Sequence, residues 1–182
     1  MIFLSAGHNK RLTDADPGAV YGNIKEADLT IELRDLIINE LQLLQANFIT
    51  DKDDETLKEY IASIKPGSGS VVVELHFNSS VNIATGTEVI IKNEYSKIEK
   101  QLATDICNSI ATSCGLVNRG VKTEAQSHRG RLGILHTKAG VSVLVEVCFI
   151  NNKFDMEQYQ ESKIAIASKI ALLLWQYDDL YK

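Results

Sequence analysis

The stretch SVVVELHF, residues 70–77, decides the fold of this chain. It is a nearly unbroken apolar run of strand length, which is typical of a strand buried on both faces of a sheet. Similar runs are MIFLSA at residues 1–6 and VSVLVEVCF at residues 141–149. Segments with helical periodicity separate these runs. The sequence therefore predicts an α/β fold, in which a single domain contains a mostly parallel, twisted sheet of about six strands with helices on both faces.

The other elements follow from periodicity and turn residues. Further strands are expected in ANFIT (46–50), GTEVIIK (86–92) and LGILH (132–136). Helices are expected along the apolar stripe at residues 29–44, with Asn23 as the cap, then in residues 53–64, in residues 98–114, and from about residue 154 to 177. Residues 9–23, which are polar, and residues 118–131, which are rich in charge, are predicted to be loops.

Composition limits the classes of function. The 182 residues, 45% of them hydrophobic, suit one domain with one core, taken as residues 1–182. A net charge of -5 without a basic cluster makes nucleic acid an unexpected partner. No apolar run reaches the length of a membrane span, and no signal peptide precedes the first strand, so we expect synthesis in the cytoplasm. The three cysteines are expected to be reduced and buried.

Ionisable residues interrupt two of the apolar runs. Strand alternation places Glu74 and His76 on one face of their strand, and Glu146 breaks a run of valines near the end of its own strand. Such residues need partners when they are buried. His76 is either a hydrogen-bonded core histidine or a functional residue, and Glu146 is either functional or part of a salt bridge. The basic candidates for that bridge are Arg129, Arg131 and Lys122.

Two further residues lie where ligands gather in α/β proteins. His8 follows the first strand, and the carboxyl ends of such strands form the usual binding edge. Glu26 shares the apolar stripe of the first helix with Leu29 and Leu33. The alternatives are a hydrogen-bonded loop histidine and a capping box, in which Glu26 bonds back to a backbone amide near Asn23.

Two histidines and one glutamate form the ligand set of many catalytic zinc sites. His8, Glu26 and His76 would supply three ligands and leave the fourth position to water. Their separation along the chain is not a compact motif such as H-E-x-x-H. The residue types and their places, rather than the spacing, indicate this site.

Seven short motifs carry a resemblance that extends over essentially the whole chain. They are SAGH (5–8), DPGA (16–19), Glu26, ELHFNSS (74–80), GTEV (86–89), RGVK (119–122) and LVEVCFINNKFD (144–155). In these motifs the chain resembles the zinc-dependent N-acetylmuramoyl-L-alanine amidases of the Amidase_3 family, especially the catalytic domains of phage endolysins. The resemblance implies a fold like that of the zinc exopeptidases and hydrolysis of the amide between N-acetylmuramic acid and L-alanine in peptidoglycan.

The resemblance also implies roles for particular residues. It makes His8, Glu26 and His76 the ligands of one Zn²⁺ ion, and Glu146 the general base. The candidates for contacts with the substrate are Glu74, Glu88, Lys122 and Arg131. Glu74 is alternatively an acceptor for the second ring nitrogen of a zinc-bound histidine, or a member of a plain salt bridge.

The biological setting implied by the resemblance is cell lysis. Peptidoglycan is the expected partner, and no separate domain that binds the cell wall is expected. We expect the enzyme to reach the wall after release from the cytoplasm, through a holin-type pore or another export route. The chain has Cys148 where many relatives have glycine, and it is expected to lack the plug helix that closes the site of some relatives.

Two other functions fit the same residues. A zinc peptidase on this kind of sheet would cut within the stem peptides of peptidoglycan. A non-catalytic module would bind peptidoglycan without cutting it, and its sign would be a substituted ligand or base. None of His8, Glu26, His76 and Glu146 is substituted.

Overall fold

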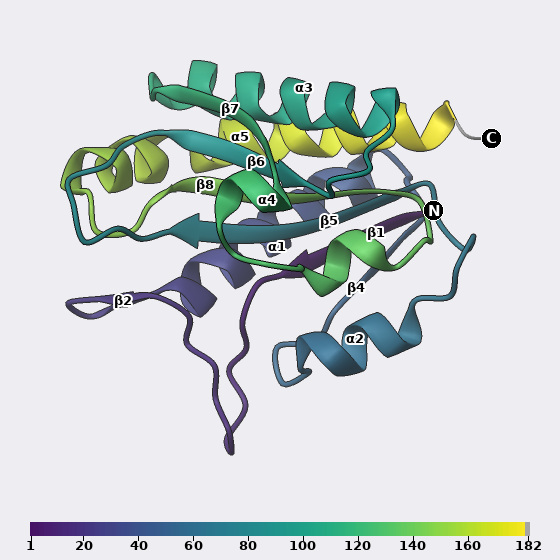
Figure 1. Cartoon of the computed structure of the whole chain (residues 1–182), viewed down its shortest axis with the longest axis horizontal. Helices are drawn as coiled ribbons and strands as arrows, with labels where there is room; N and C mark the ends of the chain where they lie inside the picture. The colour runs from purple at the N-terminus through teal and green to yellow at the C-terminus, as the bar shows by residue number, and fades with distance from the viewer. Residues whose placement is uncertain (181–182) are drawn as a thin grey trace.

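A six-stranded sheet forms the centre of the molecule (Figure 1). The computed structural model describes residues 1–180. In spatial order the strands are β4 (Phe48–Thr50), β1 (Ile2–Ala6), β5 (Val71–Asn78), β8 (Val141–Phe149), β6 (Thr87–Ile91) and β7 (Asn118–Thr123). The first four are parallel, whereas β6 runs antiparallel to β8 and parallel to β7. The prediction of a mostly parallel sheet of about six strands is confirmed.

Helices cover both faces of the sheet, as predicted (Figure 1). The long-helix face carries α1 (Glu26–Leu43), α3 (Lys97–Cys114) and α5 (Lys153–Asp179). The short-helix face carries α2 (Leu57–Ser63), α4 (Glu124–Ser127) and the 3-10 helix η1 (Gly133–His136). A hairpin of β2 (Val20–Tyr21) and β3 (Ile24–Lys25) precedes α1. Among residues 1–180, no helix combines the length and the apolar character needed to cross a bilayer.

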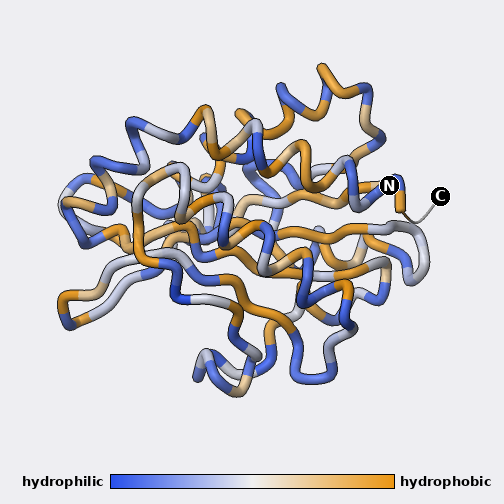
Figure 2. Tube along the Cα trace, turned by 90° about the horizontal axis from the view of Figure 1, so that it is seen from above, coloured by the Kyte–Doolittle hydropathy of each residue, from blue (hydrophilic) through white to orange (hydrophobic). Residues whose placement is uncertain are grey.

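Side-chain alternation along β5 separates the two cores. Val73 and Leu75 lie in the large hydrophobic cluster on the long-helix face, whereas Val72 lies in the smaller cluster on the short-helix face. The strand period of two therefore places Glu74 and His76 on the short-helix face. Figure 2 shows hydrophobic residues along the central strands and mixed colours along the helices. Burial of each apolar side chain contributes about 1.5 to 3 kcal/mol, so the apolar residues fix the orientation of the strand.

Local signals define the ends of α3. The Ser96 hydroxyl accepts a hydrogen bond from the backbone N–H of Glu99 (3.1 Å), and the Glu99 carboxylate accepts one from the backbone N–H of Ser96 (2.7 Å). This capping box satisfies amides that the first turn leaves free. The helix ends at Gly115, whose φ of 64° is the left-handed conformation that glycine adopts without strain. The cysteines are buried and free, as predicted.

Three segments differ from the prediction. Residues 9–23 are not a loop throughout, because Val20–Tyr21 form β2. Residues 118–131 do not form one loop, because residues 118–123 pair with β6 as β7 and residues 124–127 form α4. β7 is an edge strand, and its polar composition conceals its pairing. The stretch LGILH is not a strand but contains η1, whose Ile134 and Leu135 are both buried. Adjacent residues can both face a core in a helical turn, whereas strand residues alternate, and a short apolar run does not distinguish the two.

Candidate metal centre and active site

Three residues from distant parts of the chain meet at one edge of the sheet. His8 follows β1, His76 lies near the end of β5, and Glu26 is the first residue of α1. Because β1 and β5 are parallel neighbours, their carboxyl ends reach the same edge. One ligand atom from each residue lies within 4.8 Å of the other two. The structure therefore brings together the three predicted ligands, and they could hold a metal ion.

The carboxylate of Glu26 lies between the two imidazole rings. Its Oε2 is 3.1 Å from Nε2 of His8, and its Oε1 is 3.0 Å from Nδ1 of His76. Oε1 also accepts a hydrogen bond from the backbone N–H of Phe77 (2.9 Å), and Oε2 accepts one from that of Ala19 (2.8 Å). Both oxygens are therefore fixed by the backbone as well as by the histidines.

The capping box considered for Glu26 is not formed. The N-cap of α1 is Lys25, which makes no side-chain cap bond, and Asn23 lies in the turn between β2 and β3. Because the hairpin separates Asn23 from the first turn of the helix, Asn23 cannot cap it. Glu26 is 4% exposed and directs its carboxylate to the histidines instead.

A second carboxylate lies beside each histidine, at the ring nitrogen that faces away from Glu26. Nδ1 of His8 is 3.0 Å from Oδ2 of Asp16, and Nε2 of His76 is 3.2 Å from Oε2 of Glu74. The His8–Asp16 contact is an ion pair without hydrogen-bond alignment. Carboxylates at these positions would serve as outer acceptors that fix the tautomer and the ring orientation of metal-bound histidines. Glu74 thus occupies one of its predicted places. Sequence reasoning missed Asp16, although the turn residues Pro17 and Gly18 that follow it bring this loop back towards His8.

Two glycines leave room for this cluster. A Cβ atom on Gly7 would lie 2.3 Å from Cε1 of His76, and one on Gly18 would lie 2.6 Å from Oε2 of Glu26. Gly18 also has a φ of 65°, a conformation that favours glycine. His8 itself has a φ of 71°, which is uncommon for a residue with a side chain. A positive φ in a residue other than glycine is a strained conformation of the kind that occurs often at functional sites.

The electrostatics of the cluster fit a cation. Burial alone would lower the pKa of His76, but hydrogen bonds to Glu26 and Glu74 raise it. Burial alone would raise the pKa of Glu26, but hydrogen bonds to His76 and His8 lower it. The site thus stabilises positive charge next to an ionised carboxylate. Two imidazole nitrogens and one carboxylate oxygen match the protein ligands of a catalytic zinc ion and leave one tetrahedral position open.

Glu146 lies on β8 directly opposite His76 of β5. Its side chain is fully buried, and burial raises the pKa of its carboxyl, although His76 and Arg129 oppose this. Nη2 of Arg129 is 2.9 Å from Oε1 of Glu146, so Arg129 is the basic partner among the three candidates. The contact is an ion pair without hydrogen-bond alignment, and neither carboxylate oxygen accepts a hydrogen bond from the described residues. Glu146 therefore retains free acceptor positions.

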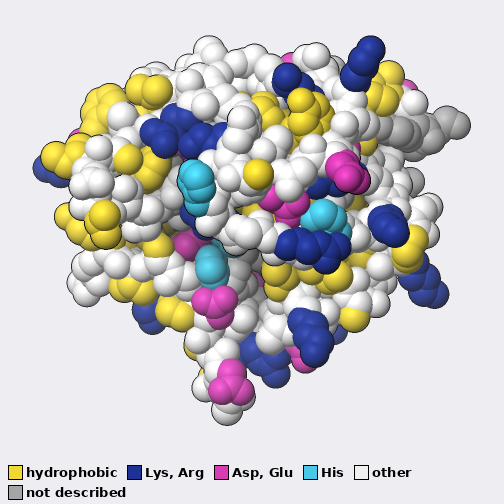
Figure 3. All heavy atoms as spheres, viewed as in Figure 1, with side chains coloured by type: hydrophobic (Ala, Val, Ile, Leu, Met, Phe, Trp, Pro, Cys, Tyr) yellow, Lys and Arg dark blue, Asp and Glu magenta, His cyan; other side chains and the backbone are white. Residues whose placement is uncertain are grey.

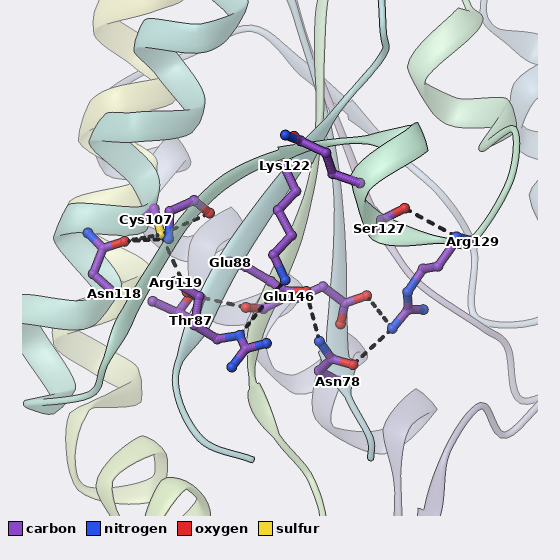
Figure 4. Close-up of polar contacts among 12 residues, drawn as sticks. Asn78, Thr87, Glu88, Cys107, Asn118, Arg119, Lys122, Ser127, Arg129 and Glu146 are labelled. Carbon is purple, nitrogen blue, oxygen red and sulfur yellow. Dashed lines mark hydrogen bonds and ion pairs between the residues drawn. The ribbon is translucent and has the colours of Figure 1, made fainter. Parts of the chain in front are cut away.

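Glu88 anchors a group of basic side chains next to Glu146 (Figure 4). It faces Glu146 across the β6–β8 pair, and its Oε2 is 2.6 Å from both Nε of Arg119 and Nζ of Lys122. Asn78 donates a hydrogen bond to Oε1 of Glu88 (3.1 Å) and accepts one from Nη2 of Arg129 (3.0 Å). We call the three cations on this network the basic cluster: Arg119, Lys122 and Arg129.

Arg131 lies apart from these contacts. It lines a hollow of about 850 Å³ together with His128 and His136, and it makes no ion pair with any described residue. Nε2 of His136 is instead 3.0 Å from Oε1 of the buried Glu124. Figure 3 shows histidines with acidic and basic side chains close by on this face of the molecule.

A buried arginine supports the strand that leads to His8. Nη1 of Arg34, on α1, is 3.2 Å from Oδ1 of Asp51, and that oxygen accepts a hydrogen bond from the backbone N–H of Ala6 (3.1 Å). Arg34 and Asp51 are both buried, at 5% and 8% exposure. The pair fixes the end of β1, two residues before His8, and sequence reasoning did not find it.

The model of the Amidase_3 family, described as N-acetylmuramoyl-L-alanine amidase, matches residues 2–174. The chain belongs to this family. The resemblance found in the motifs is thereby confirmed, and the family supports a hydrolase that acts on peptidoglycan.

Two proteins of Bacillus subtilis (strain 168) each match 88% of this chain. The uncharacterized protein YqiI is 28% identical over 169 residues, and the match covers 77% of YqiI. The N-acetylmuramoyl-L-alanine amidase LytC is 24% identical over 166 residues. The chain spans only 32% of LytC.

Solved structures share the fold. An N-acetylmuramoyl-L-alanine amidase from Clostridium difficile 630 has a TM-score of 0.82 at 21% identity, covering 98% of this chain and 96% of that chain. The catalytic domain of the CD27L endolysin targeting Clostridia difficile has a TM-score of 0.76 at 23% identity, covering 96% of both chains. At these identities the likeness establishes the architecture of this amidase-family domain.

Proposed function

We propose that this chain is a zinc-dependent N-acetylmuramoyl-L-alanine amidase that contributes to cell lysis. The observation that carries the proposal is the convergence of His8, Glu26 and His76 at the sheet edge, with Glu146 opposite His76 on the next strand. Membership of the family supports the bond and the polymer that are cut. The outer carboxylates at both histidines support a metal site rather than a buried salt-bridge cluster.

The residues divide the chemistry between them. A zinc ion held by His8, Glu26 and His76 would lower the pKa of a bound water and polarise the scissile carbonyl. Glu146 accepts the proton of the attacking water, because its oxygens are buried and carry no hydrogen bond from the described residues. It then gives that proton to the nitrogen of L-alanine as the C–N bond breaks. The products are the lactyl carboxylate and a free amino terminus.

The substrate contacts predicted from the sequence take different places in this proposal. Lys122 presents a cation beside Glu146, while Glu88 holds that cation in position. Glu74 acts through His76 rather than on the substrate. Arg131 would meet only a distal part of the glycopeptide, because it lines a separate hollow.

Product analysis tests the proposal. Zinc-loaded protein is incubated with purified peptidoglycan, with and without a chelator, and the soluble products are identified by mass spectrometry. The expected result is release of stem peptides that begin with free L-alanine, with the glycan strands intact and no release after chelation. Addition to living cells with a turbidity readout then tests the lytic role.

The competing functions give other products. A zinc peptidase would leave shortened stems attached to muramic acid. A binding module would sediment with peptidoglycan and release nothing. Either result would replace the proposed amidase activity.

A further inference from the structure

The basic cluster has more positive charge than the carboxylates beneath it. Glu88 and Glu146 supply two negative charges, whereas Arg119, Lys122 and Arg129 supply three positive charges. This local excess contrasts with the net charge of -5 of the whole chain. The carboxylates are buried, but the cations are 27% to 40% exposed. The cluster therefore presents a positive surface beside the site, which suits an anionic group of a ligand.

Arg129 is the member of this cluster whose guanidinium keeps N–H donors that no described residue uses (Figure 4). Its Nη2 contacts Glu146 and Asn78, whereas its Nε and Nη1 have no partner among residues 1–180. Its side chain is 40% exposed. Nε and Nη1 lie on different edges of the guanidinium, because both edges that could bind a carboxylate with two parallel hydrogen bonds include Nη2. Each of them can still donate one charge-assisted hydrogen bond to a carboxylate.

The place of Arg129 fixes how far its ligand lies from the reaction. Arg129 bonds to Asn78, two residues beyond His76, and contacts Glu146 opposite His76. A general base lies within hydrogen-bond reach of the attacking water. A group bound by Arg129 is therefore within one or two residues of the scissile bond, since an extended chain advances only about 3.5 Å per residue.

Peptidoglycan offers one carboxylate at that distance. The second stem residue is D-glutamate joined through its side chain, which leaves its α-carboxyl group either free or amidated as D-isoglutamine. We infer that Arg129 binds the free α-carboxylate of this residue, so that the chain prefers unamidated stems. The inference rests on the proposed amidase function and adds the substrate class to it. Arg119 and Lys122 contribute positive potential without being displaced from Glu88.

The test compares two substrates that differ by one group. The zinc-loaded enzyme is given N-acetylmuramoyl-L-alanyl-γ-D-glutamyl-L-lysinamide and its α-amide, in both of which the γ-carboxyl group is in a peptide bond, and kcat/KM is measured for each. We expect at least about a tenfold preference for the free acid, as a charged hydrogen-bond pair commonly confers. Arg129→Gln should abolish the preference, and Arg129→Lys should restore part of it. Lys58→Gln, which removes an exposed cation from α2 on the short-helix face, should leave the preference unchanged.

The ratio of kcat/KM between the two substrates distinguishes a role of Arg129 in substrate recognition from a general loss of activity. If Arg129→Gln slowed both substrates equally while the preference persisted, Arg129 would act only on Glu146 and the inference would be wrong. Equal cleavage of both substrates by the unmodified enzyme would also overturn it, while leaving the amidase function intact. Calorimetric binding of L-alanyl-γ-D-glutamyl-L-lysinamide and its α-amide to the same variants gives the answer without turnover. Equal affinities for the unmodified protein would contradict the inference even if the amidase function failed.

Discussion

Oε2 of Glu74 lies 3.2 Å from Nε2 of His76, whereas Nδ1 of the same ring faces Glu26. The carboxylate is 2% exposed, so water does not substitute for it. A buried acceptor at this nitrogen orients the ring and increases the basicity of the other nitrogen. We therefore expect Glu74 to orient His76 for a metal ion without being a ligand itself.

Replacing Glu74 should therefore weaken zinc binding without removing a ligand. Glu74→Gln is expected to lower zinc affinity by roughly 10-fold to 100-fold, the usual effect of losing an outer carboxylate. Competition with a fluorescent chelator measures the change. Glu94→Gln removes an exposed carboxylate from the surface and serves as the matched control. Unchanged zinc affinity in Glu74→Gln would leave that residue with a structural role alone.

Two variants should distinguish the loss of metal binding from the loss of turnover. Glu146→Gln should retain zinc but lose about 10²-fold to 10⁴-fold in kcat, because a general base is removed. His76→Ala should lose both zinc and activity, because a ligand is removed. Metal analysis of the dialysed proteins and peptidoglycan hydrolysis provide the two readouts. An active Glu146→Gln enzyme would refute the assignment of the base.

Removal of zinc should lower thermal stability. A ligand that binds only the folded chain at about 100 times its Kd adds roughly 2.7 kcal/mol to the free energy of unfolding. For a domain of this size, each kcal/mol corresponds to about 2 to 4 °C in Tm. Differential scanning fluorimetry with and without a chelator should thus show a shift of roughly 5 to 10 °C. The shift should vanish in His76→Ala, and its persistence there would place the metal elsewhere.

The pairing of Glu88 should make stability depend on pH. Burial alone would raise the pKa of Glu88, but hydrogen bonds from Arg119 and Lys122 lower it. A carboxyl whose pKa is lower in the folded chain adds stability above its unfolded pKa, about 4.3, and that stability is lost as pH falls through the folded value. Glu88→Gln should therefore cost roughly 1 to 3 kcal/mol at pH 7.

The difference between the two proteins should shrink as the pH falls below about 4, because Glu88 takes up a proton first in the unfolded chain and, at lower pH, in the folded protein as well. Urea unfolding at neutral and acidic pH measures this difference in the free energy of unfolding. A destabilisation of the same size at both pH values would show that shape, rather than charge, accounts for the effect.

Residues within regular elements were the most predictable from the sequence. His76 and Glu74 could be placed on one face because strand alternation is independent of the rest of the fold. Glu146 could be singled out because a carboxylate buried in a run of valines is costly unless it has a partner or a function. The parallel sheet then explains why His8 and His76 reach one edge.

Contacts between distant loops were not predictable in the same way. Asp16 has a side chain that is 59% exposed and lies in an irregular loop, where no period marks it. Arg34 pairs with Asp51 across a helix and the segment after β4, which only the folded chain brings together. Arg129 was one of three candidate partners for Glu146. Its flanking residues His128 and Gly130 have left-handed backbone conformations, and this turn places the Arg129 side chain beside Glu146.

The sheet separates the chemistry from most of the packing. Glu74, His76 and Glu146 belong to the short-helix face, whereas the large cluster beneath α1, α3 and α5 lies behind the strands. Surface changes around the basic cluster can therefore accumulate over evolution while the main core keeps its shape. A domain built in this way can change the residues that face its ligand while the packing behind the sheet stays the same.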